Sequence, residues 1–206
     1  MKKQISRQSR ILITLILCLA MIWPTWYVTY SRYIKYFGIT LKATQDYPIK
    51  KVEYYLQSDP VWAADLIGNS DYKMGGAGCL IACLAATLGD LGISVNPGQL
   101  NQILSAASAY TADGDLIWYK IKEAIPEVDY RYSRVFTAKT IESDLALGLL
   151  PIVNVKFHGS GITHWVLIVG AQNGEFLIYD PAERSLTYLE LLTHGKVYAY
   201  RVIEKH

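Results

Sequence analysis

One cysteine stands where the sequence could make it a nucleophile. Cys79 follows the glycine-rich run 74–78 and opens the apolar stretch 80–88, a pattern typical of a loop that leads into a buried helix. Unpaired backbone N–H groups and the helix dipole favour a thiolate at the first turn of a helix. Cys79 is therefore the candidate nucleophile, provided that a base lies nearby.

A cysteine nucleophile also needs a third group that orients the base. His164 stands near the start of the β-rich run 163–169, so its ring can lie at the end of a strand. Asp180 follows the next β-rich run, 176–179, and Pro181 ends that strand. We expect a hairpin of these two strands, in which His164 is the base and Asp180 orients it.

Strand register decides whether these two side chains can meet. With a two-residue loop at 173–174, Asp180 would lie opposite Leu167, and His164 would point to the other face of the sheet. A three-residue loop, a five-residue loop or a β-bulge would remove the conflict. We predict a five-residue loop, 171–175, which makes Asp180 and His164 diagonal neighbours on one face.

The elements that must position these residues change in character along the chain. Helices are predicted at 80–88, 96–107, 113–125 and 137–147, with one strand at 128–135. Short β-rich runs separated by Gly, Asn and Asp then follow at 151–157, 163–169, 176–179 and 196–202. Helices followed by an antiparallel sheet indicate an α+β fold, with a helical layer packed on the sheet.

The composition argues against several classes of protein. The chain has 206 residues and a formal net charge of +2, which indicates neither a nucleic-acid-binding protein nor an acidic tail. Its three cysteines, with Cys18 in the N-terminal apolar run, do not form a disulfide framework. Cys79 and Cys83 lack a second pair with metal-ligand spacing. We expect no metal and no cofactor, and we assign Cys83 to the core and His158, His194 and His206 to solvent or loops.

The N-terminal segment has the pattern of a membrane anchor. No charged residue occurs between positions 11 and 31, and about 20 apolar residues suffice to cross a bilayer. Basic residues precede this stretch and aromatic residues cluster at its far end, as at a membrane interface. A cleaved signal peptide would share the basic start and the apolar centre, although no small-x-small cleavage site follows. We expect a cytoplasmic N-terminus at 1–10, a transmembrane signal anchor at 11–30, a juxtamembrane linker at 31–51, and an extracytoplasmic domain at 52–206.

Several short sequences occur in a fixed order within 52–206: Gln57-Ser58-Asp59-Pro60-Val61-Trp62, Gly78-Cys79, Gly148-Leu149-Leu150-Pro151-Ile152-Val153, His164-Trp165-Val166 and Tyr179-Asp180-Pro181. As a set they resemble the C39-like family of papain-fold cysteine peptidases. The resemblance implies a papain-like fold with Cys79 as nucleophile, His164 as general base and acid, and Asp180 as orienter. It also implies that the Gln57 side chain donates to the oxyanion. The sequence departs from the family pattern directly after Cys79, where the family often has a small residue and a proline.

The expected function is that of a membrane-anchored cysteine peptidase, which cleaves a peptide or protein substrate through a thioester acyl-enzyme. Its partners are this substrate and, through the N-terminal helix, the membrane; no nucleic acid is expected. Two alternatives stay open: a thiol-dependent amidase or transferase that acts on cell-wall peptides, and an inactive papain-like module that binds peptides. The fold alone does not decide between them.

Overall fold

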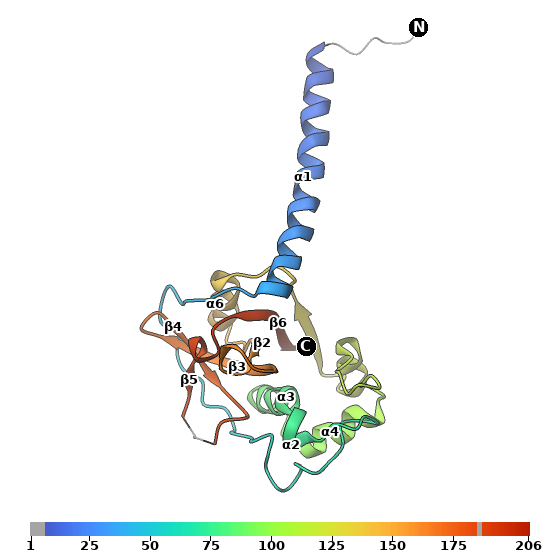
Figure 1. Ribbon diagram of the computed structural model, residues 1–206, viewed down its shortest axis with the longest axis vertical. Helices are drawn as coiled ribbons and strands as arrows, with labels where there is room; N and C mark the ends of the chain where they lie inside the picture. Colours follow the sequence, from blue (N-terminus) through green and yellow to red (C-terminus); the bar gives the residue numbers. More distant parts are fainter. Residues whose placement is uncertain (1–6, 185–186) are drawn as a thin grey trace.

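A six-stranded antiparallel sheet organises the chain in the computed structural model, which describes residues 7–184 and 187–206 (Figure 1). The spatial order of the strands is β1-β6-β2-β3-β4-β5. The strands are β1 (Val128–Tyr132), β2 (Ile152–Lys156), β3 (Thr163–Gln172), β4 (Glu175–Tyr179), β5 (Leu189–Glu190) and β6 (Val197–Lys205). The predicted α+β fold is confirmed.

The helices precede most of the strands, as expected. They are α1 (Arg7–Phe37), α2 (Met74–Ala77), α3 (Cys79–Asp90), α4 (Pro97–Ala106), α5 (Ile121–Ala124) and α6 (Ala138–Ala146), with 3₁₀ turns η1 (Trp118–Lys120), η2 (Phe157–Gly159) and η3 (Leu191–His194). The predicted helix at 113–125 is wrong in its first half. Gly114 has φ +77° and closes a turn in which Thr111 N–H donates to Asp115 O, a backbone conformation that interrupts a helix.

Both faces of the sheet are covered, and alternation along each strand divides the core in two. On one face, Ile152, Leu167 and Val169 pack with α3 and α4. On the other face, Val153, Val155, Val166 and Ile168 pack with α6 and with the end of α1. The central strands therefore bury side chains on both sides. The packing of Leu167 and Val169 on α3 places β3 beneath that helix.

Helix α1 extends away from the sheet and its helices, and only its last turns pack on them (Figure 1). Ile34 is buried in the core on the α6 side of the sheet. Within residues 7–184 and 187–206, none of the helices combines the length and the apolar character needed to span a bilayer. The transmembrane helix predicted at 11–30 is therefore not found there. Residues 1–6 of the predicted cytoplasmic N-terminus lie outside the described residues.

The segment after α1, predicted as a linker, crosses the sheet and adds to its core. Ile39 bridges Val197 and Tyr47 bridges Ala171, while Leu41 is buried. The crossing chain lies so close to Gly170 that an added Cβ there would be 2.9 Å from the Ile49 Cα. Residues 38–50 thus lead from the end of α1 to the middle of β3.

Candidate active site

Cys79 is the first residue of α3 and is held there by the short helix α2. Gly78 alone separates the two helices, and its N–H donates to Met74 O at 2.8 Å. A Cβ at position 78 would lie 2.5 Å from that oxygen. This close approach is what requires glycine here. The backbone conformation does not, because a φ of −81° is open to any residue. The fold thereby places the thiol at the N-terminus of a buried helix, as predicted.

His164 lies near the start of β3 and is bound to Asp180. Its Nε2 is 2.6 Å from Asp180 Oδ1. Since Nε2 is engaged with the carboxylate, Nδ1 is the ring nitrogen left for Cys79, and the side-chain hydrogen bond with Cys79 helps to raise the pKa of His164. The three residues are only 7%, 4% and 1% exposed for Cys79, His164 and Asp180. They form a chain at the floor of a cleft, with little competition from bulk water.

The electrostatics of this hydrogen-bonded group favour an ion pair of His164 and Asp180. Burial lowers the pKa of His164, but the hydrogen bonds with Asp180 and Cys79 outweigh burial and raise that pKa to about 9. Burial raises the pKa of Asp180, but the hydrogen bonds from His164 and His194 outweigh it and hold the pKa well below its usual range. At neutral pH the carboxylate is ionised and favours the imidazolium, which lies next to the Cys79 thiol.

Asp180 has a second histidine partner that the sequence did not reveal. His194 was assigned to solvent or a loop, but it is completely buried and its Nε2 is 2.9 Å from Asp180 Oδ2. The backbone N–H of His158 donates to His194 Nδ1 at 3.0 Å. Because Nδ1 is an acceptor, the ring proton sits on Nε2 and points at the carboxylate. His194 therefore holds the Asp180 carboxylate through its second oxygen, while His164 binds the first.

Other contacts complete the setting of Asp180 and His164. The N–H of Ala182 donates to Asp180 Oδ1 at 2.8 Å, and the Tyr54 hydroxyl donates to Asp180 O at 3.0 Å. The Phe157 ring meets the His164 ring edge-on, with 5.3 Å between centroids. Both oxygens of the carboxylate are thus occupied, and the imidazole is covered on one side.

The hairpin that joins β3 and β4 solves the register problem in a way other than the one preferred from sequence. Its turn has two residues, Asn173 (φ +55°) and Gly174 (φ +81°), so the predicted five-residue loop is wrong. A β-bulge between Ile168 and Gly170 shifts the register by one residue. Leu167 therefore pairs with Tyr179, which leads Asp180 to the same face as His164. The crossing segment holds the bulge, because Lys50 N–H donates to Val169 O at 2.8 Å.

Gln57 lies beside the same cleft and is buried. Its backbone N–H donates to Pro181 O at 2.9 Å, which ties it to the turn after Asp180. Its side-chain amide donates to Gly75 O at 3.2 Å. A carboxamide has two N–H groups, so one remains for an oxygen in the cleft. Gln57 therefore lines the same cleft as Cys79 and His164, with one amide N–H not used by Gly75.

The cleft over Cys79 has a volume of about 640 Å³. It is bounded by α2, by the start of β3 and by the turn that contains Asp113 and Asp115. Ile162 and Tyr72 are both exposed at its walls. In the part of the chain that the structure describes, no three His, Cys, Asp or Glu residues are placed to hold a metal ion. The cleft is large enough for several residues of an extended peptide.

Cys83 lies one turn after Cys79 but in a different environment. It is completely buried, and its Sγ donates to Trp165 O at 3.5 Å. Burial raises the pKa of the Cys83 thiol well above its ordinary value. Cys83 is a core residue, as predicted.

The same fold occurs in a solved structure, that of a protein from Bacillus anthracis provisionally assigned as a C39-like peptidase. The TM-score is 0.54, the sequence identity is 12%, and the match covers 79% of this chain and 98% of the other. No family model matches the sequence, and no curated protein matches it. At this identity the likeness shows the fold, which is the one that the sequence resemblance implied.

Proposed function

We propose that this protein is a cysteine peptidase with a papain-like, C39-like domain. One observation carries the proposal: a cysteine at a helix N-terminus shares a buried chain of hydrogen bonds with His164 and Asp180, in which Nε2 and Oδ1 are 2.6 Å apart. The fold likeness to a protein provisionally assigned as a C39-like peptidase supports the proposal. The constellation is that of an activated thiol nucleophile with its base and orienter.

In the first half of the reaction, the Cys79 thiolate attacks the carbonyl carbon of the scissile amide and a C–S bond forms. The negative charge that develops on the carbonyl oxygen is stabilised by the backbone N–H of Cys79 and by the free N–H of the Gln57 amide. His164 then donates its Nδ1 proton to the leaving nitrogen. The C–N bond breaks, the amine departs, and a thioester remains on Cys79.

In the second half, His164 is neutral and takes a proton from a water molecule. The resulting hydroxide attacks the thioester carbonyl, and the same donors stabilise the oxyanion. The C–S bond breaks, the carboxylic acid product leaves, and the thiolate and the imidazolium are restored. Asp180 remains ionised throughout and holds the imidazole in the orientation that both halves require.

We further propose that the enzyme works at a membrane, with its cleft outside the cytoplasm. The sequence supports this location, because basic residues precede the charge-free stretch 11–31. Labelling with a membrane-impermeant amine reagent in intact cells tests it. Lysines of the domain that react before lysis agree with the location, and lysines that react only after lysis contradict it.

The activity is tested with the full chain and a peptide mixture, by comparing wild type with Cys79→Ala and with the matched control Cys83→Ala. We expect cleavage by wild type and by Cys83→Ala, none by Cys79→Ala, and a mass increase on Cys79 when the thioester is trapped by acid quench. Thioester resolution by an added amine in preference to water would instead assign a transferase. Absence of both cleavage and thioester would assign a peptide-binding module.

A further inference from the structure

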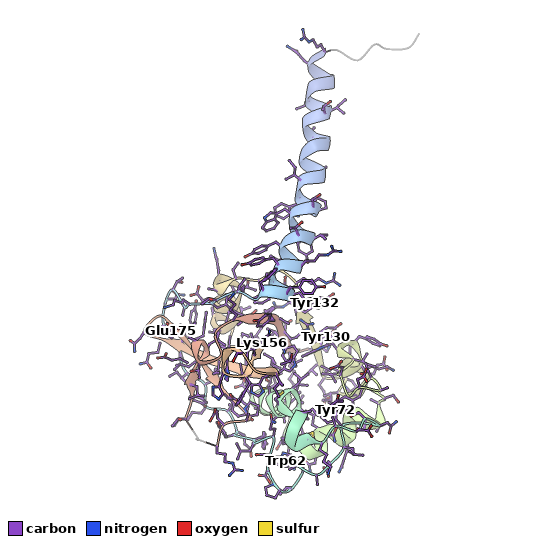
Figure 2. All side chains as sticks on the ribbon, viewed as in Figure 1. Trp62, Tyr72, Tyr130, Tyr132, Lys156 and Glu175 are labelled. Carbon is purple, nitrogen blue, oxygen red and sulfur yellow. The ribbon has the colours of Figure 1, made fainter. Side chains whose placement is uncertain are left out.

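A second hollow, larger than the catalytic cleft, lies between α1 and the end of the sheet where the edge strand β1 pairs with β6. Its volume is about 780 Å³, compared with about 640 Å³ for the cleft. No residue lines both. Tyr130 and Tyr132 mark its floor beneath the foot of α1 (Figure 2). We name this hollow the basic groove, because its charged lining residues are Arg32, Lys35, Arg134 and Arg201.

The cations of the basic groove lack carboxylate partners in the part of the chain that the structure describes. Among those residues, no Asp or Glu lines the groove. Across residues 7–184 and 187–206, none of the four cations forms an ion pair with a carboxylate. Burial lowers the pKa of Arg201, and the charge of Arg134 makes a smaller contribution in the same direction. Uncompensated like charges in one hollow attract an anion.

The guanidinium of Arg201 is held rigidly with a donor left over. It lies over the Trp118 ring at 5.1 Å and over the Tyr132 ring at 5.0 Å. Its Nη1 donates to Tyr200 O at 2.7 Å, whereas its Nε is buried and has no acceptor among the described residues. Native structures rarely leave a buried donor unpaired. The stacking therefore keeps the guanidinium in place for an acceptor that the chain itself does not supply.

Arg131 provides a comparison, because it is an arginine with a structural role. It belongs to the same edge of the sheet, one residue before Tyr132, but points to the opposite face. Its Nη2 is 2.5 Å from Asp144 Oδ1 and its Nε is 2.6 Å from Glu204 Oε1. Two carboxylates thus neutralise Arg131, while Arg201 and Arg134 have none among the described residues. The difference indicates that the anion of the basic groove comes from outside the chain.

The chemistry of the groove fits a phosphate group. Guanidinium groups bind phosphate with two parallel hydrogen bonds, and tyrosine hydroxyls can donate to its remaining oxygens. The part of α1 beside the groove exposes Trp23, Trp26 and Phe37 to solvent, side chains that favour the interface of a lipid bilayer. We propose that the basic groove binds the phosphate of an anionic phospholipid headgroup, and so orients the domain on a lipid surface.

The test uses the full chain and vesicles of phosphatidylcholine alone or with phosphatidylglycerol. The wild type is expected to bind the anionic vesicles more tightly, and salt weakens this preference. Arg134→Gln and Arg201→Gln are each expected to reduce the preference roughly fivefold, the typical contribution of one cation near an anionic surface. Lys139→Gln removes an exposed charge outside the groove and is expected to keep the preference.

The variants separate the possible outcomes. Arg134 is exposed and has no structural hydrogen bond in the part of the chain described, so its variant tests the groove even if Arg201→Gln fails to fold. Equal losses in Arg134→Gln and Lys139→Gln would overturn the proposal in favour of general charge attraction. Displacement of the protein from vesicles by excess inorganic phosphate, at constant ionic strength, would assign the groove to free phosphate instead of a lipid. Cleavage of a soluble peptide by Arg134→Gln is expected to equal that of wild type, so failure here leaves the peptidase proposal intact.

Discussion

Two regions of the molecule each contain a buried carboxylate held by two side chains. Asp180 and Asp144 are 1% and 2% exposed. Asp180 is bound by His164 and His194 next to the catalytic cleft. Asp144, on α6, belongs to the other side of the sheet.

Asp144 is bound by Arg131 and by the Tyr200 hydroxyl. A guanidinium keeps its charge at every physiological pH, so this pair can fix the packing of α6 but cannot move a proton. An imidazole gains or loses a proton near neutral pH, so the partners of Asp180 can take part in chemistry. Both regions bury a charge, and they differ in the partners of the carboxylate and in access to a cleft.

The largest effect is expected when the imidazole partner of Asp180 that touches Cys79 is removed. His164→Ala should lower kcat/KM on the order of 10⁴-fold, because the nucleophile loses its base and the leaving group its acid. The matched change removes a partner of the other carboxylate, Asp144: Arg131→Gln should leave kcat/KM unchanged. Peptide cleavage assays with circular dichroism as the folding control measure both. Equal losses in the two variants would remove the distinction between the regions.

The next effect concerns the oxyanion. Gln57→Ala should lower kcat by about 10²- to 10³-fold with little change in KM, because the lost hydrogen bond is made mainly in the transition state. Steady-state kinetics on the same peptide measure it. A rise in KM at constant kcat would instead make Gln57 a residue that binds substrate.

On the scaffold side, the expected loss is one of stability. Asp144→Asn should lower the free energy of unfolding by about 1–3 kcal/mol, because Arg131 and Tyr200 lose a charged acceptor. The partial exposure of Arg131 and its second partner, Glu204, favour the lower end of this range. Urea unfolding measures the change. A loss of kcat in the folded variant would contradict a purely structural role.

Removal of the second histidine should give a smaller effect on catalysis. His194→Gln should lower kcat by roughly tenfold, the cost of one charge-assisted hydrogen bond. It should also raise the pKa of Asp180, so that the acid limb of the pH–rate profile moves to higher pH. His158→Asn is the matched control, because it removes the ring contact with His194 but keeps the backbone N–H that donates to His194 Nδ1. An unshifted acid limb would restrict His194 to packing.

The smallest effect is the pH dependence of the unaltered protein above neutrality. The pKa of His164 is about 9 in the folded chain, above the usual value of about 6.5 for an unfolded one. The stability that this shift provides is complete below about pH 6.5 and is lost as the pH rises through 9. Cleavage should decline over the same upper range, as the imidazolium is lost. A pH–rate profile that stays flat to pH 10 or so would show that the proton on His164 is not needed.

Local sequence signals were enough for most of the fold. The helix at 97–106 begins at Asn96, which forms the capping box with Gln99 that such a start requires. Strands β2, β3, β4 and β6 follow from their β-rich composition, whereas β5 (Leu189–Glu190) was not predicted. The position of Cys79 follows from the glycine-rich sequence before it. These features depend on neighbours in the chain, which a sequence displays directly.

The parts that sequence reasoning missed depend on contacts between distant segments. The bulge in β3 is held by a chain segment that crosses from residue 50, and His194 reaches Asp180 only because η2 and η3 meet. Nothing in the residues around His194 marks it as buried. The triad residues could be chosen from their order, but the second partner of Asp180 could not.

The most direct test of the central claim is the rate at which iodoacetamide alkylates Cys79 as a function of pH, with each modified cysteine located by mass spectrometry. The account predicts rapid alkylation of Cys79 at neutral pH, loss of that rapid reaction in His164→Ala, and no alkylation of folded Cys83. A slow reaction at Cys79 with the same rate with and without His164 would contradict it.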